Sequence, residues 1–227
     1  MAYLIGIDVG TSSTKAILIN DSGQVIKTVA PEYDFHTPKP LWAESNPLDW
    51  WTATIAAIKS LLDDIDASKI VGLGLTGQMH GLVCLDKDGE VLRPCIMWND
   101  QRTADQCREM TARIGDDDVI AITGNPILPG FTAPKLRWIE ENEPEVYSRI
   151  DKILLPKDYI RYKLSGEFFT DVSDASGTSL LDVQQRRWAH YILNEFKWPM
   201  SWLPEVTEST EATTRISSDA ATVTGLP

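Results

Sequence analysis

The chain has 227 residues, 43% of them apolar, which is enough to build the core of one large domain. A net charge of −12 and the absence of any run of lysine and arginine argue against binding to nucleic acid. The three cysteines stand in no C-x-x-C spacing, which argues against a zinc site and a disulfide framework. No apolar run is long enough to span a membrane and no secretion signal opens the chain, so we expect a cytoplasmic protein that does not bind membranes.

Short apolar runs separated by small and polar residues open the chain. They cover 3–8, 14–19 and 24–29. This pattern predicts three consecutive strands in an antiparallel meander. Apolar residues then recur at helical spacing over 46–65, where Asn46 is placed to cap a helix and Pro47 to occupy its first position.

Strand patterns resume after this helix, and helical patterns follow them. The run 69–76 predicts a strand buried on both faces, and 81–98 predicts two strands around the turn "DKDG". Further elements are expected as helices over 103–114, 133–142 and 156–164 and as a strand over 152–155. The predicted fold class is therefore α/β with a mixed sheet. The polar tail from 207 is expected to complete no element.

The stretch "LIGIDVGTSSTKAILIN" places an aspartate before a cluster of small residues. It matches neither the G-x-G-x-x-G fingerprint nor the P-loop, so we interpret it as a tight turn between two strands. The turn could bind an anion through the backbone N–H groups and hydroxyls of its residues and through Lys15; the turn residues are Gly10, Thr11, Ser12 and Ser13. Asp8 beside such an anion would hold Mg²⁺. For this string alone, a polar turn with an incidental aspartate is the favoured alternative.

Several segments, in this order, resemble one known family. Asp-x-Gly-Thr-Ser in a hairpin is similar to the first phosphate loop of the actin, hexokinase and sugar-kinase superfamily. Within that superfamily, "GFTAPKLRWIEEN" (130–142) resembles a diagnostic segment of the FGGY carbohydrate kinases. The segments that resemble the xylulose-phosphorylating branch of this family are "GQMHG" (77–81), "WNDQR" (98–102), 154–168 and 170–183.

The resemblance covers essentially the whole chain and implies a fold and an activity. The fold would be a ribonuclease H-like, actin-like ATPase domain, a mixed sheet with helices on both faces. Residues 1–227 would be the N-terminal domain, and about 210–227 would start the connection to a second domain. The implied reaction is phosphorylation of D-xylulose by ATP with Mg²⁺. Another FGGY kinase, acting on gluconate, glycerol, ribulose or fuculose, and a non-catalytic sugar-binding module are the alternatives. A homodimer stays open.

Two segments are candidates for binding the sugar. In "GQMHG", which follows an apolar strand, Gln78 and His80 offer polar groups, and the family resemblance assigns Met79 and His80 to ketose contact. In "WNDQR", a polyol could stack on the ring and accept and donate hydrogen bonds at the neighbouring groups of Trp98, Asn99, Asp100 and Arg102. The equally weighted alternative for this segment is a helix start capped by Asn99 or Asp100.

Other aspartates are interpreted as structural. Asp158, Asp171 and Asp174 fit caps and turns, with Asp174 the nearest of them to the site. The run 116–118 fits the acidic first turn of a surface helix rather than a metal site. In the family, a further aspartate in a Gly-Gly-x-Asp loop accepts the sugar proton. This chain contains no Gly-Gly pair, so the resemblance implies that the general base lies outside it and that these residues alone are inactive.

Overall fold

The computed structural model describes residues 2–227. The strands are β1 Tyr3–Val9, β2 Thr14–Asn20, β3 Val25–Val29, β4 Glu44–Ser45, β5 Ile70–Gly77, β6 Val83–Leu85, β7 Cys95–Ile96, β8 Lys152–Leu154, β9 Phe169–Asp171, β10 Leu181–Asp182, β11 Arg187–Trp188 and β12 Glu205–Thr207. The helices are α1 Pro47–Leu62, α2 Ala104–Ile114, α3 Asp116–Thr123, α4 Thr132–Asn142, α5 Pro144–Tyr147, α6 Pro156–Ser165, α7 Val172–Ser176, α8 His190–Phe196 and α9 Ser218–Thr224.

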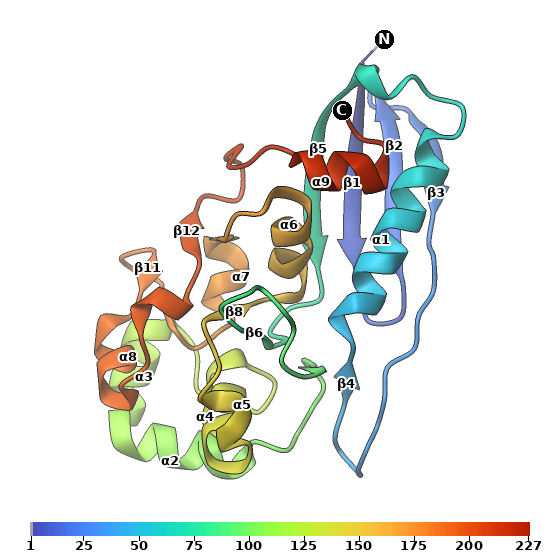
Figure 1. Cartoon of the computed structure of the whole chain (residues 1–227). Coiled ribbons are helices and arrows are strands. Elements are labelled where there is room, and N and C mark those ends of the chain that lie inside the picture. The colour runs from blue at the N-terminus through green and yellow to red at the C-terminus, as the bar shows by residue number, and fades with distance from the viewer. Residues whose placement is uncertain (1) are drawn as a thin grey trace.

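A mixed sheet forms the frame of the molecule, in the order β3-β2-β1-β5. The first three strands pair antiparallel and β5 runs parallel to β1, so the predicted meander and the mixed sheet are both confirmed. Figure 1 shows this sheet beside α1, with both chain ends near one end of β1. Polar residues follow the opposite end of β1, which is where the candidate site lies.

One face of the sheet is buried under helices. Ile5, Ile7 and Val9 alternate along β1 toward this face, where they join one core with residues of α1, α6 and α9. The helix α1 begins as predicted, because Asn46 accepts a hydrogen bond from the amide of Leu48 and Pro47 needs no amide partner. It ends at Leu62, three residues before the predicted boundary at 65.

A second core joins the helical half of the chain to β6, β7 and β8. Its residues come mainly from α2, α4 and α8, which Figure 1 shows at the far side of the molecule from β3. The predicted helices that became α2, α4 and α6 and the predicted strand 152–155 are all confirmed, with boundaries shifted by one residue. Cys84, Cys95 and Cys107 are free and buried in the two cores.

Four expectations differ from the structure. The strand β5 is an edge strand with Val71 67% exposed, so it is not buried on both faces. The strands β6 and β7 pair with β8 and β4 rather than with each other, apart from isolated bridges. The tail contains the complete helix α9, which packs on α1 and α6. The expectation of helices on both faces of the sheet is also not met. Helices cover the face that carries Ile5, whereas Leu4, on the other face, is 43% exposed.

Within residues 2–227, no helix has both the length and the apolar character that a membrane crossing requires.

Candidate functional site

The turn after β1 carries the first predicted group. Asp8 is exposed and lies directly opposite Lys15 on β2 and beside Thr76 on β5. Residues paired in this way point to the same face of a sheet. The three polar side chains therefore gather on the open face, at the end of β1. Asp8 and Lys15 thus lie next to each other, and their predicted roles at a metal and an anion stay predictions.

The turn between β1 and β2 leaves a row of backbone donors free. Gly10 closes the turn by donating to the carbonyl of Ser13 at 2.9 Å, and a side chain at Gly10 would press on that carbonyl. Within residues 2–227, no hydrogen bond takes up the amides of Thr11, Ser12 and Ser13. Consecutive free N–H groups in a turn form a concavity that suits an anion. Three of the four predicted backbone donors are therefore free, whereas the amide of Gly10 is taken up within the turn; binding of an anion by the free amides stays a prediction.

Tyr33 stabilises this turn through two hydrogen bonds. Its hydroxyl donates to the carbonyl of Gly10 at 2.8 Å, and its amide donates to the carbonyl of Ser12. Burial raises the pKa of Tyr33 to about 12; a hydrogen bond with Thr14 lowers it and the nearby Asp8 carboxylate raises it further. The phenol therefore stays protonated and remains a donor at neutral pH. No role for Tyr33 was predicted from the sequence.

Two predicted side chains from distant segments contact the same turn. Gln78 donates from Nε2 to the carbonyl of Gly10 at 3.0 Å, and Trp98 donates from Nε1 to Oγ1 of Thr11 at 3.1 Å. Trp98 and Met79 are nonetheless about half exposed, at 43% and 52%. The fold therefore brings three of the predicted segments together, and two large apolar side chains are left open to solvent there.

His80 is held in a single orientation. It adopts a left-handed backbone conformation, with φ of 65°, which costs energy for a residue other than glycine. Its Nδ1 lies 2.6 Å from the carbonyl of Gly177, and its ring packs on that of Phe131 with 4.5 Å between the centroids. Burial lowers the pKa of His80, so the ring is neutral at pH 7. A carbonyl only accepts, so Nδ1 carries the proton and Nε2 is left as an acceptor.

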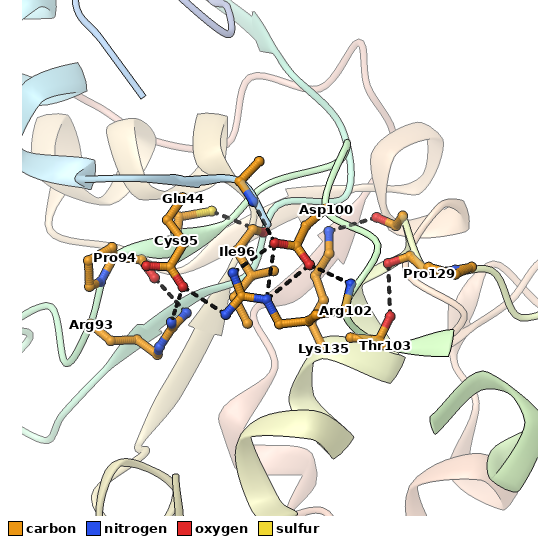
Figure 2. A network of polar contacts seen from close by, with 12 residues as sticks. Glu44, Arg93, Pro94, Cys95, Ile96, Asp100, Arg102, Thr103, Pro129 and Lys135 are labelled. Carbon is orange, nitrogen blue, oxygen red and sulfur yellow. Dashed lines mark hydrogen bonds and ion pairs between the residues drawn. The ribbon is translucent and has the colours of Figure 1, made fainter. Parts of the chain in front are cut away.

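Asp100 and Arg102, predicted as sugar contacts, belong to a buried ion-pair network (Figure 2). Arg102 pairs with Asp100 and with Glu44, both at 2.7 Å, and stacks on Trp42. Arg93 pairs with the same Glu44 at 2.6 Å. Asp100 also accepts the amide of Ala43 at 2.7 Å. The charged groups of this segment thus face the protein, and their assignment to a substrate stays a prediction.

The alternative interpretation of "WNDQR" as a helix start capped by Asn99 or Asp100 is wrong. The helix α2 begins at Ala104 with Thr103 in the cap position, and neither Asn99 nor Asp100 caps it. Asp100 instead accepts the amide of Arg102 two residues later, which closes a turn. Asn99 is half-buried, and its Oδ1 has no partner among the described residues.

The remaining aspartates lie in an ion-pair cluster, a helix cap and a first helical turn. Lys157 is buried and pairs with Asp158 at 2.6 Å, Asp171 at 2.8 Å and Asp174 at 3.3 Å. Burial alone would lower the pKa of Lys157, but the three carboxylates raise it above its usual value. Asp171 also caps α7. The run 116–118 forms the first turn of α3, and the described residues contain no cluster of three metal-ligating side chains.

Lys135, a fully buried lysine on α4, lies in the segment 130–142 that resembles the family, but no role was predicted for it. Its Nζ donates to the carbonyls of His80 at 2.9 Å and Gly130 at 2.6 Å. No carboxylate of the described residues lies within ion-pair distance of it. Burial lowers the pKa of Lys135 to about 7. A neutral amine still has two N–H donors, which matches its two carbonyl partners. A lysine among the apolar positions of a helix was the available signal.

The lowered pKa of Lys135 predicts a pH-dependent stability. Above pH 7 the unfolded chain, whose lysines have a pKa near 10.5, holds more proton at this position than the folded chain, and the difference grows from about half a proton at pH 7 toward one proton near pH 8.5. The free energy of unfolding is therefore expected to rise with pH there, by at most about 1.4 kcal/mol per pH unit. Urea unfolding of the wild type and of Lys135→Met at several pH values measures this. Equal slopes for the two proteins would contradict the prediction.

Known proteins are similar to this chain along nearly its whole length. The family model described as "FGGY family of carbohydrate kinases, N-terminal domain" matches residues 3–227. The chain is 44% identical to the xylulose kinase of Escherichia coli (strain K12), over 98% of this chain and 46% of that protein. It is similar to the crystal structure of xylulose kinase from Rhodospirillum rubrum, with a TM-score of 0.94 and 31% identity over 99% of this chain and 46% of the other.

A second solved structure keeps the substrate open. The gluconate kinase of Lactobacillus acidophilus matches with a TM-score of 0.93 and 29% identity, over 100% of this chain and 46% of that one. The chain thus spans about half the length of the relatives it matches. Its match to the family model nevertheless runs along almost every residue. The chain therefore belongs to the FGGY family of carbohydrate kinases.

Proposed function

We propose that this chain supplies the sugar-binding and phosphate-binding side of an ATP-dependent kinase for D-xylulose. The observation that carries the proposal is the turn after β1. It presents three free amides beside Asp8 and is joined by hydrogen bonds to Gln78 and Trp98. A phosphate binder and two candidate sugar contacts thus share one small region. The xylulose kinases among the similar proteins support the choice of sugar.

The open end of β1 has the chemistry that a Mg-nucleotide requires. Mg²⁺ is commonly held by one or two carboxylates together with water and phosphate oxygens, and Asp8 is an exposed carboxylate without an ion-pair partner in residues 2–227. Asp8 would hold the ion, which neutralises charge on the transferring phosphate. The amides of Thr11, Ser12 and Ser13 would donate to the phosphate oxygens, and Lys15 would add positive charge.

The sugar would lie against the segment that follows β5. Nε2 of His80 is an acceptor for a sugar hydroxyl, because Nδ1 is committed to Gly177. The exposed Met79 and Trp98 offer an apolar wall for the carbon face of the sugar. With sugar and phosphate held in line, transfer would depend mainly on positioning and charge neutralisation. We place the acceptor of the hydroxyl proton beyond Pro227, as the family resemblance implies.

The experiment that tests this proposal is a substrate panel. The longest reading frame that contains this chain is purified and assayed for sugar-dependent ATP turnover with D-xylulose, gluconate, glycerol, ribulose and fuculose. We expect the highest kcat/KM with D-xylulose. A higher value with another sugar would replace the substrate and keep the kinase. Turnover with none of them, together with measurable sugar binding, would favour the non-catalytic module.

The orientation of His80 predicts how the affinity for D-xylulose depends on pH. Burial holds the pKa of His80 below its ordinary value, so acidification from neutral pH through that lowered pKa protonates Nε2 and removes the acceptor. KM for D-xylulose is expected to rise as the pH falls through this range. In His80→Asn the amide can still donate to Gly177 and tolerates the left-handed backbone, but no group replaces Nε2.

The variant His80→Asn is therefore expected to bind D-xylulose about tenfold more weakly at pH 7.5, as the loss of one hydrogen bond implies, and to lose the pH dependence. Isothermal titration at several pH values measures both effects. Wild-type affinity in His80→Asn and in His80→Ala would remove His80 from the site.

A further inference from the structure

Lys135 connects two parts of the chain that form the candidate site. Its ammonium or amine nitrogen lies between the carbonyl of His80, 2.9 Å away, and the carbonyl of Gly130, 2.6 Å away. The side chain is fully buried. No carboxylate of residues 2–227 pairs with Lys135, so the hydrogen bonds to these two carbonyls are what stabilises its buried nitrogen.

The hydrogen bond from Lys135 to the carbonyl of His80 bears on the position of the His80 side chain. His80 adopts a left-handed backbone conformation, which must be held by surrounding contacts. Its carbonyl accepts from Lys135 and also from Oγ1 of Thr132 at 3.1 Å, while its ring is held by Gly177 and Phe131. Lys135 and Thr132 together fix the backbone, and the ring contacts fix the side chain. Both sets of contacts determine where Nε2 points.

The second carbonyl ties Lys135 to Trp98. A Cβ at Gly130 would lie 2.8 Å from the backbone oxygen of Trp98, so the two backbones are in direct contact. Trp98 in turn donates to Thr11 of the phosphate turn. Figure 2 shows Lys135 beside the Asp100–Arg102 pair that follows Trp98 in the chain. Lys135 therefore links the backbone of His80 directly to that of Gly130, and through Gly130 to the backbone of Trp98.

We infer that Lys135 is a positioning residue for the sugar, which acts by holding the backbone of His80 at a fixed place relative to Gly130 and Trp98. It touches neither sugar nor phosphate. The inference rests on the proposed function for the identity of the ligand. The contacts themselves hold for whichever sugar this site binds.

The test is the variant Lys135→Met, which keeps the length of the side chain and removes both hydrogen bonds. In the longest reading frame that contains this chain, we expect KM for D-xylulose to rise at least tenfold, while KM for ATP and kcat change less than threefold. Thr132→Val removes the other donor to the same carbonyl and is expected to raise KM for D-xylulose by a smaller factor. Leu136→Ala is the matched control, because it truncates a buried side chain of α4 that has no polar atom.

A loss of general stability would act on all these variants alike, so the split between KM and kcat separates the two explanations. Wild-type KM for D-xylulose in a folded Lys135→Met, or an equal rise in Leu136→Ala, would overturn the inference. If Lys135→Met does not fold, an unchanged KM in Thr132→Val would overturn it. If the wild type uses a different sugar, the ratios of variant KM to wild-type KM are measured with that sugar and test the inference in the same way.

A readout that needs no sugar separates this inference from the proposed function. The ring nitrogens of His80 are followed by NMR in the wild type and in Thr132→Val and Lys135→Met. We expect their resonances to shift in both variants and to stay in place in Leu136→Ala. Unchanged resonances in Lys135→Met would overturn the inference even if D-xylulose proved to be the substrate.

Discussion

Arg102→Met is expected to lower the free energy of unfolding by about 3–5 kcal/mol, which is the usual cost of removing one partner from a buried ion pair. The guanidinium is 1% exposed and pairs with Asp100 and Glu44, whose side chains are 0% and 12% exposed. Removal of Arg102 leaves the carboxylate of Asp100 buried with only amide donors for compensation. Its stacking on Trp42 at 3.7 Å is lost as well. Chemical denaturation measures the change.

Two further variants make this prediction specific. Arg102→Lys keeps the charge but loses the planar, bidentate contact with Asp100, so a substantial part of the loss should remain. Arg108→Met is the matched control, since the pair of Arg108 with Asp105 is largely exposed, at 74% and 80%, and should change stability little. A loss of stability in Arg102→Met no larger than in Arg108→Met would contradict the account of this network.

Asp8→Asn is expected to reduce kcat for sugar phosphorylation by about 10²–10³-fold, the usual effect of removing one group that stabilises transition-state charge. The substitution keeps the shape of the side chain and removes the charge that would hold Mg²⁺. Because Asp8 is exposed and pairs with no lysine or arginine of residues 2–227, the variant should fold normally. Steady-state kinetics at saturating D-xylulose and Mg-ATP measure kcat.

The control for Asp8→Asn is Asp64→Asn, another exposed aspartate, which lies just beyond the end of α1. It should leave kcat unchanged. A kcat in Asp8→Asn within threefold of the wild type would mean that the metal is held elsewhere.

Local patterns predicted the frame of the fold well. The meander and α1 were confirmed because each follows from neighbouring residues: the alternation along β1, and the cap Asn46 with Pro47 behind it. The helix α9 was missed because its sequence, rich in threonine and serine, has weak helical preference. Its capping by Ser217 and its burial of Ala220 against the first core override that preference.

The candidate site was predicted in part. Asp8, Gln78 and Trp98 could be singled out because they lie at the ends of apolar runs that predict strands, and His80 because of such a position together with the family resemblance. The orientation of Arg102 could not be predicted, since its partner Glu44 and its stacking partner Trp42 lie almost sixty residues earlier in the chain. The contacts of Lys135 were likewise out of reach, because the carbonyl of His80 lies 55 residues away from it in sequence.

A crystal structure of the longest reading frame that contains this chain, with D-xylulose and a non-hydrolysable Mg-ATP analogue, tests the central claim most directly. The account predicts a sugar hydroxyl within hydrogen-bonding distance of Nε2 of His80. It also predicts phosphate oxygens at the amides of Thr11, Ser12 and Ser13, with Mg²⁺ next to Asp8. A sugar bound away from the segment 78–80, or a nucleotide whose phosphates avoid the turn after β1, would contradict it.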